Sequence, residues 1–143
     1  MNKLDVTFLQ KCINALEKAF ELYSIAPEDS IEKDIYRSAC IKEFEIILEQ
    51  CAKIIKKILK NYVVSSLEID RLFFKDVFRK ACQFGVLNIE ETERWLEYRD
   101  KRNLTAHEYG QSFAENIIEV LESFIKDAQS VVTSVNKFNK DAN

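Results

Sequence analysis

The sequence predicts an all-α protein, an up-and-down helical bundle of about five helices with a four-helix-bundle core and one short helix. Two observations lead to this prediction. Only two glycines and one proline interrupt the 143 residues, which favours long helices over a sheet with many turns. Apolar residues also recur at alternating steps of four and three, the spacing of an amphipathic helix. The length suits a single domain over residues 1–143.

The first half of the chain is predicted to form two long helices. The first runs from about Leu4 to Ile25, and Pro27 ends it because helix is disfavoured at the residue before a proline. The second runs from about Ser30 to Tyr62, with Asp29 as its N-cap and Glu32 as the reciprocal partner. Its apolar stripe consists of Phe44, Leu48, Cys51, Ile55, Ile58 and Tyr62.

The second half is predicted to contain three helices. A short helix runs from about Ile69 to Phe84 and ends at Gly85, a residue that adopts the left-handed conformation of a C-cap. The next begins with an N-cap and capping box formed by Asn88 and Glu91. The last runs from Ser112 to about Phe138 and carries the most regular apolar stripe: Ile117, Leu121, Phe124, Ala128, Val131, Val135 and Phe138.

Composition excludes several classes of function. The net charge is −3, so any nucleic-acid contact must be local, because general affinity requires a strongly basic face. The start of the chain lacks the apolar run of a signal peptide, and no apolar stretch reaches membrane-spanning length. We therefore expect a cytoplasmic protein without a membrane partner. The four cysteines are scattered and there is one histidine, so we predict no metal site and no cofactor.

The candidate site is the stretch from Arg102 to Tyr109. It holds the only histidine, His107, and places a guanidinium, an imidazole and a phenol close together. A guanidinium forks onto phosphate oxygens, and an imidazole exchanges protons near neutral pH. Arg102 and His107 would point about 140° apart on a continuous helix, so the helix must end or distort between them, or the long Arg102 side chain must bend round. A purely structural interpretation also stands, in which Arg102 caps a helix end, His107 packs in a turn and Tyr109 covers the core.

This stretch resembles the signature of HEPN-type helical domains, in which four residues separate Arg from His and a Tyr follows two residues later. Within them it is most similar to the nucleotidyltransferase substrate-binding proteins, the helical partners of minimal nucleotidyltransferases. Other similar positions are Phe44, Glu45, Glu49 and Lys53, together with Phe78–Ala81 and Gly85–Leu87. The family often places Trp where this chain has Ala52.

The resemblance implies a site and its partners. The expected nucleotide-binding residues are Arg99, Arg102, Asn103, His107 and Tyr109, with Arg102 and His107 catalytic if the protein is an enzyme. Tyr109 stands where some relatives accept an adenylyl group. A minimal nucleotidyltransferase is the implied partner, in a module of the toxin–antitoxin type. Because acid–base catalysis on RNA works best with two proton-transferring groups, the single histidine also predicts a homodimer that brings two copies together.

Three interpretations of the function therefore stand open. The first is a nucleotide- or RNA-binding subunit that pairs with a nucleotidyltransferase. The second is a metal-independent endoribonuclease toxin that uses Arg102 and His107 across a homodimer. The third is a non-catalytic helical scaffold. Other enzyme classes are disfavoured, because the sequence contains neither a glycine-rich phosphate loop nor a G-x-S-x-G elbow. Whether the protein is an enzyme is left open by the sequence.

Overall fold

The computed structural model describes residues 3–105 and 111–141, without the side chains of residues 104–105 and 111–113. Every regular element in these ranges is helical, as predicted. In chain order the elements are α1 Thr7–Ile25, α2 Ile31–Leu59, the 3₁₀ turn η1 Lys60–Tyr62, α3 Ser66–Asp70, α4 Phe74–Gln83, α5 Ile89–Thr105, α6 Gln111–Ile118 and α7 Leu121–Asp141.

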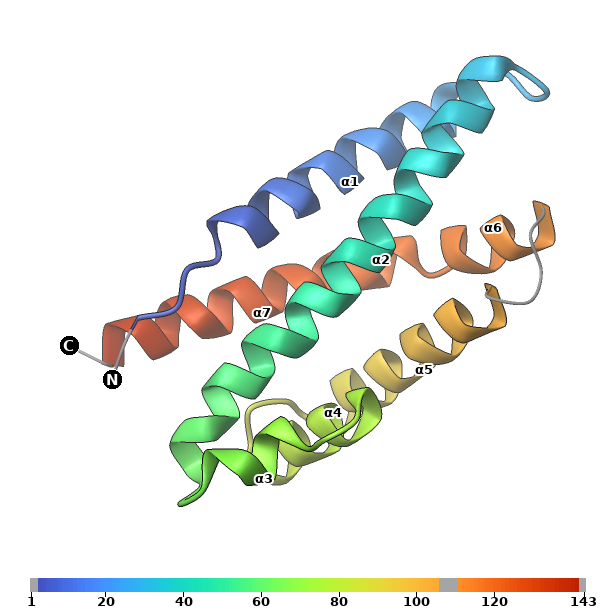
Figure 1. Ribbon diagram of the computed structural model, residues 1–143. Coiled ribbons are helices and arrows are strands. Elements are labelled where there is room, and N and C mark those ends of the chain that lie inside the picture. The colour runs from blue at the N-terminus through green and yellow to red at the C-terminus, as the bar shows by residue number, and fades with distance from the viewer. Residues whose placement is uncertain (1–2, 106–110, 142–143) are drawn as a thin grey trace.

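The long helix α2 crosses the whole bundle (Figure 1). It packs against α1, α3, α4, α5, α6 and α7. In the view of Figure 1, α1 lies on one side of it, α4 and α5 lie on the other, and α7 crosses it. This central place explains its composition, because residues on several sides of α2 are buried: Phe44, Ile47, Leu48, Cys51, Ile54, Ile55, Ile58 and Leu59.

An aromatic cluster forms the centre of the core. The ring centroids of Phe44 and Phe124 lie 4.5 Å apart, and those of Phe78 and Trp95 lie 4.9 Å apart in a stacked arrangement. Tyr98 meets Phe124 edge-on at 5.0 Å. Because these rings come from α2, α4, α5 and α7 and are fully buried or nearly so, the cluster joins all four helices and fixes how α5 sits in the bundle.

Helix ends follow their local chemistry. Asn88 and Glu91 form the predicted capping box, with Glu91 N–H donating to Asn88 Oδ1 at 2.8 Å and Asn88 N–H donating to Glu91 Oε1 at 3.2 Å. Gly85 has a positive φ of 78°. It ends α4 in a Schellman motif, in which Val86 N–H donates to the Ala81 carbonyl at 2.8 Å. Both predictions are confirmed, and together they set where α5 begins.

The N-cap predicted for α2 was wrong by one residue. Asp29 has a φ of 62°, whereas an N-cap residue takes an extended conformation. Ser30 has that conformation, and its Oγ accepts from Lys33 N–H at 3.0 Å. Asp and Ser are both common at the N-cap position, so the sequence alone did not show which of Asp29 and Ser30 is the N-cap. The first helix also begins at Thr7 rather than at Leu4.

The helix predicted over Ile69–Phe84 is two helices. The chain is extended at Phe73, between α3 and α4. In one continuous helix Ile69, Phe73 and Val77 would share a face. The turn leaves Ile69 and Val77 fully buried and exposes 82% of Phe73.

The last predicted helix is also divided, at Glu119 and Val120, into α6 and α7. Ile117 and Leu121 are both fully buried on either side of the turn. The apolar spacing of four residues therefore continues across the break, which is why periodicity did not reveal it. Within residues 3–105 and 111–141, no helix is both long enough and apolar enough to cross a membrane.

Candidate functional site

Arg102 lies near the C-terminal end of α5, on the face of that helix that points into the bundle. It follows Trp95 by seven residues and Tyr98 by four, so the three side chains form one stripe. Trp95 and Tyr98 are buried, and Arg102 is partly buried. The stripe thus changes from aromatic to cationic where the core meets the end of the helix. A cation there is also favoured by the helix dipole.

The three residues before Arg102 each meet an opposite charge on a different element. Arg99 Nη1 lies 3.2 Å from Glu49 Oε1 on α2, and Asp100 Oδ1 lies 2.6 Å from Lys75 Nζ on α4. Lys101 Nζ lies 3.8 Å from a Glu119 carboxylate oxygen at the turn before α7. Because successive residues on a helix point about 100° apart, these contacts hold the end of α5 from three sides.

Arg99 has a second partner. Its guanidinium carbon lies 4.8 Å from the centroid of the Phe74 ring, and its side chain is 25% exposed. A guanidinium held between a carboxylate and an aromatic face is pre-oriented but remains reachable from solvent. Arg102 follows Arg99 by three residues, about one turn further along α5.

The structure describes only some of the predicted site residues. Arg99, Arg102 and Asn103 all lie in the last turns of α5, and Asn103 is exposed. His107 and Tyr109 lie outside the described residues, as does the expected distortion between Arg102 and His107. The structure therefore brings together three of the five predicted nucleotide-binding residues, and the placement of the other two remains a prediction.

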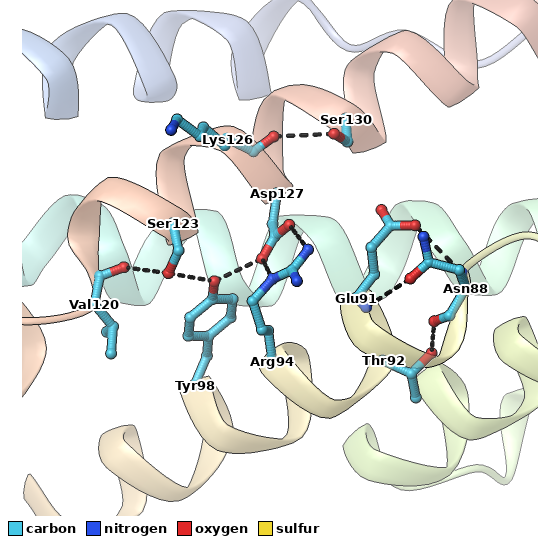
Figure 2. Close-up of polar contacts among 10 residues, drawn as sticks. All are labelled: Asn88, Glu91, Thr92, Arg94, Tyr98, Val120, Ser123, Lys126, Asp127 and Ser130. Atoms are coloured by element: carbon cyan, nitrogen blue, oxygen red, sulfur yellow. Dashed lines mark hydrogen bonds and ion pairs between the residues drawn. The ribbon is translucent and has the colours of Figure 1, made fainter.

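A polar network that was not predicted from the sequence joins α5 to α7 (Figure 2). Its centre is Asp127, whose side chain is 5% exposed. Arg94 Nε and Nη2 each donate to one Asp127 oxygen at 2.8 Å, a bidentate pairing. The Tyr98 hydroxyl donates to Asp127 Oδ2 at 2.6 Å and lies 2.9 Å from Ser123 Oγ. Ser123 Oγ lies 3.1 Å from the Val120 carbonyl oxygen, within hydrogen-bond distance.

The surroundings of this network raise the pKa values of Tyr98 and Arg94. Burial, reinforced by the hydrogen bond to Asp127, raises the pKa of Tyr98 well above its ordinary value. The hydrogen bond to Asp127 likewise raises the pKa of the Arg94 guanidinium. Both shifts favour a neutral Tyr98 hydroxyl that donates a hydrogen bond and a positively charged Arg94 guanidinium. A signal for this network was present in the sequence, because Asp127 falls inside the apolar stripe of α7, three residues after Phe124 and four before Val131.

The cationic side chains near the end of α5 suit an anionic ligand. Among residues 3–105 and 111–141, no group of three or more His, Cys, Asp and Glu side chains could hold a metal ion. Arg99 and Arg102 are three residues apart on α5, so their side chains leave the same side of the helix about one turn apart, and two guanidinium groups so spaced suit the oxygens of a phosphate.

This chain is similar in sequence and in fold to known proteins. A protein family described as "Nucleotidyltransferase substrate binding protein like" matches residues 4–137. A relative from Haemophilus influenzae, named "Probable ribonuclease HepT", is 26% identical over an alignment of 143 positions that covers 97% of each chain. A solved structure from Haemophilus influenzae is similar with a TM-score of 0.78 and 25% identity, covering 92% of this chain and 99% of that one. It is described as revealing the fold of a substrate binding domain of a nucleotidyltransferase.

Proposed function

Because this chain belongs to the family of nucleotidyltransferase substrate binding protein-like proteins, we propose that it is a nucleotide- or RNA-binding subunit that pairs with a minimal nucleotidyltransferase. The observation that carries this proposal is the family match over residues 4–137. The similar solved structure, described as a substrate binding domain of a nucleotidyltransferase, supports the same pairing. The two proteins would form a module of the toxin–antitoxin type.

The proposed site uses the end of α5. Arg102, on the inward-facing stripe, binds a phosphate through its guanidinium fork, and Arg99 adds a second positive charge one turn earlier. Asn103 and His107 supply hydrogen bonds to the sugar or base. Tyr109 lies two residues after His107 in the sequence, and we propose it as a residue that the nucleotidyltransferase partner modifies.

The site is proposed to form in a homodimer. Each chain has one histidine, whereas acid–base cleavage of a bound phosphodiester works best with one group that accepts a proton and another that donates one. Two copies of Arg102 and His107 facing each other across a two-fold axis provide both groups.

The second candidate function is endoribonuclease activity, and one observation favours it: the relative that covers 97% of this chain is named a probable ribonuclease. In this mechanism one His107 accepts the proton of a ribose 2′-hydroxyl. The 2′-oxygen then bonds to phosphorus, the bond from phosphorus to the 5′-oxygen breaks, and the second His107 gives that oxygen a proton. Arg102 stabilises the negative charge that grows on the phosphoryl oxygens, and the step consumes no cofactor.

The test measures binding and cleavage of a fluorescently labelled single-stranded RNA in EDTA. Arg102→Ala and His107→Ala are expected to weaken binding about tenfold or more, since each removes a charge-assisted or direct contact with the phosphodiester. Lys18→Ala is the matched control. It removes one positive charge from α1, where the Lys18 side chain is 65% exposed, and it should bind as the parent does.

The outcomes separate the alternatives. RNA cleavage that persists in EDTA and disappears in His107→Ala supports the ribonuclease. Binding without cleavage, with co-purification of a nucleotidyltransferase, supports the binding subunit. If both site variants lose only thermal stability and bind RNA as Lys18→Ala does, the chain is a helical scaffold and the proposal is wrong.

A further inference from the structure

Two polar contacts fix the rotation of α5 about its own axis, and the direction of Arg102 lies between them. At about 100° per residue, Arg102 points about 40° from Tyr98 and about 60° from Arg99. Tyr98 is held by Asp127 on α7, and Arg99 is held by Glu49 on α2. A rotation of α5 in either direction would therefore stretch one of these contacts.

The Tyr98–Asp127 contact restricts the rotation of α5 more tightly than the Arg99–Glu49 contact does. The Tyr98–Asp127 hydrogen bond is 2.6 Å long and buried, whereas the carboxylate of Glu49 is half exposed. Asp127 is also fixed by the two hydrogen bonds from Arg94, one turn before Tyr98. Three hydrogen bonds from one helix to a single carboxylate leave little freedom for translation or rotation of α5, because each bond weakens steeply with misalignment.

The same network reaches the turn between α6 and α7. Ser123 lies within hydrogen-bond distance of the Tyr98 hydroxyl and of the Val120 carbonyl oxygen. The Lys101–Glu119 ion pair, 3.8 Å long, joins the last turns of α5 to this turn as well. The end of α5 that carries Arg102 is thus linked to the turn that precedes α7 by part-buried hydrogen bonds through Ser123 and by an ion pair whose glutamate is exposed.

We propose that Asp127 and Tyr98 are positioning residues, which set the direction in which Arg102 enters the nucleotide- or RNA-binding site. This inference rests on the proposed function of that site. Neither residue touches the ligand. Asp127 acts by holding Arg94 and Tyr98, and Tyr98 acts through the helix that it shares with Arg102.

A buried carboxylate network is suited to this role in a way that apolar contacts are not. Apolar side chains of similar volume pack about as stably as a buried ion pair, but they tolerate repacking and small rotations. Hydrogen bonds to a fixed carboxylate are directional. The network therefore contributes orientation beyond the stability that the neighbouring aromatic cluster already provides.

The test uses Tyr98→Phe, which keeps the ring and removes the hydroxyl, and Asp127→Asn, which keeps the shape and removes the charge. Val135→Ala is the matched control. Val135 is fully buried on α7, about 12 Å along the helix from Asp127, so its truncation lowers stability away from α5. All variants are studied at a temperature where circular dichroism shows them folded.

Two readouts are compared. One is the dissociation constant for the labelled single-stranded RNA. The other is the Nε–H resonance of Arg102 in a ¹⁵N–¹H spectrum, identified because it disappears in Arg102→Lys. We expect Tyr98→Phe and Asp127→Asn to shift this resonance and to weaken RNA binding by about five- to tenfold. Val135→Ala should change neither, even where it lowers the melting temperature as much.

The outcomes distinguish this inference from the proposed function. If Arg102→Ala binds RNA as the parent does, the proposed function fails, and the resonance alone then decides whether Tyr98 and Asp127 orient Arg102. If Arg102→Ala loses binding while Tyr98→Phe and Asp127→Asn keep the parental affinity and resonance, the positioning role is overturned and the proposed function stands. Equal effects of Val135→Ala and Tyr98→Phe on RNA binding would also overturn the positioning role, because the loss of affinity would then result from lower stability.

Discussion

Arg99 on α5 and Glu49 on α2 form an ion pair, with Arg99 Nη1 3.2 Å from Glu49 Oε1. The contact links two segments that each resemble the family pattern and that lie 50 residues apart in the chain. It also places a carboxylate beside the proposed anion site. Glu49 orients Arg99, but its negative charge also offsets part of the positive charge that Arg99 would offer to a phosphate.

Glu49→Gln is therefore expected to increase RNA affinity by about two- to fivefold, because it removes a negative charge near the proposed site and frees Arg99. Stability should change by less than about 1 kcal/mol, since the pair is partly exposed. The affinity is measured by fluorescence anisotropy with the labelled RNA. Glu17→Gln on α1, an exposed position, makes the same change in net charge and serves as the control. Weaker binding by Glu49→Gln than by Glu17→Gln would show instead that the orientation of Arg99 matters more than its free charge.

Removing the guanidinium of Arg94 should destabilise the protein. In Arg94→Met the Asp127 carboxylate stays buried without its cation, which is expected to cost about 2 kcal/mol after allowing for the partial exposure of Arg94. The free energy of unfolding is measured by urea denaturation. Arg79→Met is the control, because Arg79 pairs with Asp76 on the exposed surface of α4 and should change stability by less than about 0.5 kcal/mol.

The double variant Arg94→Met/Asp127→Leu tests the cause of that loss. With both charged partners replaced by apolar side chains, much of the lost stability should return, since no unpaired charge remains in the core. If the double variant is less stable than Arg94→Met alone, the loss does not come from a stranded carboxylate, and the Tyr98–Asp127 hydrogen bond is then the dominant contribution of this network.

The fold was more predictable than the site, for physical reasons. Helical periodicity and caps are local, so the capping box of Asn88 and the left-handed Gly85 could be predicted from neighbouring residues. The breaks at Phe73 and Val120 could not, because apolar residues continue at four-residue spacing through both turns in the sequence, although the turn at Phe73 leaves that side chain exposed. At the site, the motif predicts Arg102 as a binding residue, and that role stays a prediction.

The network around Asp127 was missed although one signal existed. A carboxylate within the buried stripe of α7 requires partners, but those partners lie 33 and 29 residues away, on α5. Nothing local identifies them. A charged residue at a core position therefore indicates that a network exists, and only the packing of α5 against α7 shows that Arg94 and Tyr98 form it.

Stability should fall at alkaline pH through the buried thiols. Burial raises the pKa of Cys40 to about 11, from an ordinary value of 9.0. Below pH 9 the thiol is protonated in both states and its contribution is fully present. Above pH 9 the unfolded chain loses the proton while the folded protein keeps it, so this contribution is lost as the pH rises through about 11. The total is about 2 to 3 kcal/mol.

Cys40→Ala isolates this effect. Urea denaturation under reducing conditions at pH 7, 9 and 11 should show a smaller decline in the free energy of unfolding for the variant than for the parent, with most of the difference appearing between pH 9 and 11. The offset at pH 7 measures the packing lost with the sulfur atom and does not depend on pH. Parallel declines for the two proteins would mean that the thiol of Cys40 titrates alike in the folded and unfolded states.

The number of RNA molecules bound per chain tests whether the site is shared. If two copies of Arg102 and His107 build one cleft, the protein should sediment at micromolar concentration with twice the chain mass of 16.7 kDa and bind one short RNA per two chains at saturation. Analytical ultracentrifugation gives the first quantity, and titration of labelled RNA well above its dissociation constant gives the second. A monomer that binds one RNA per chain would leave each histidine to act alone. It would then remove the acid–base pair on which the ribonuclease mechanism depends, while the simpler binding function would survive.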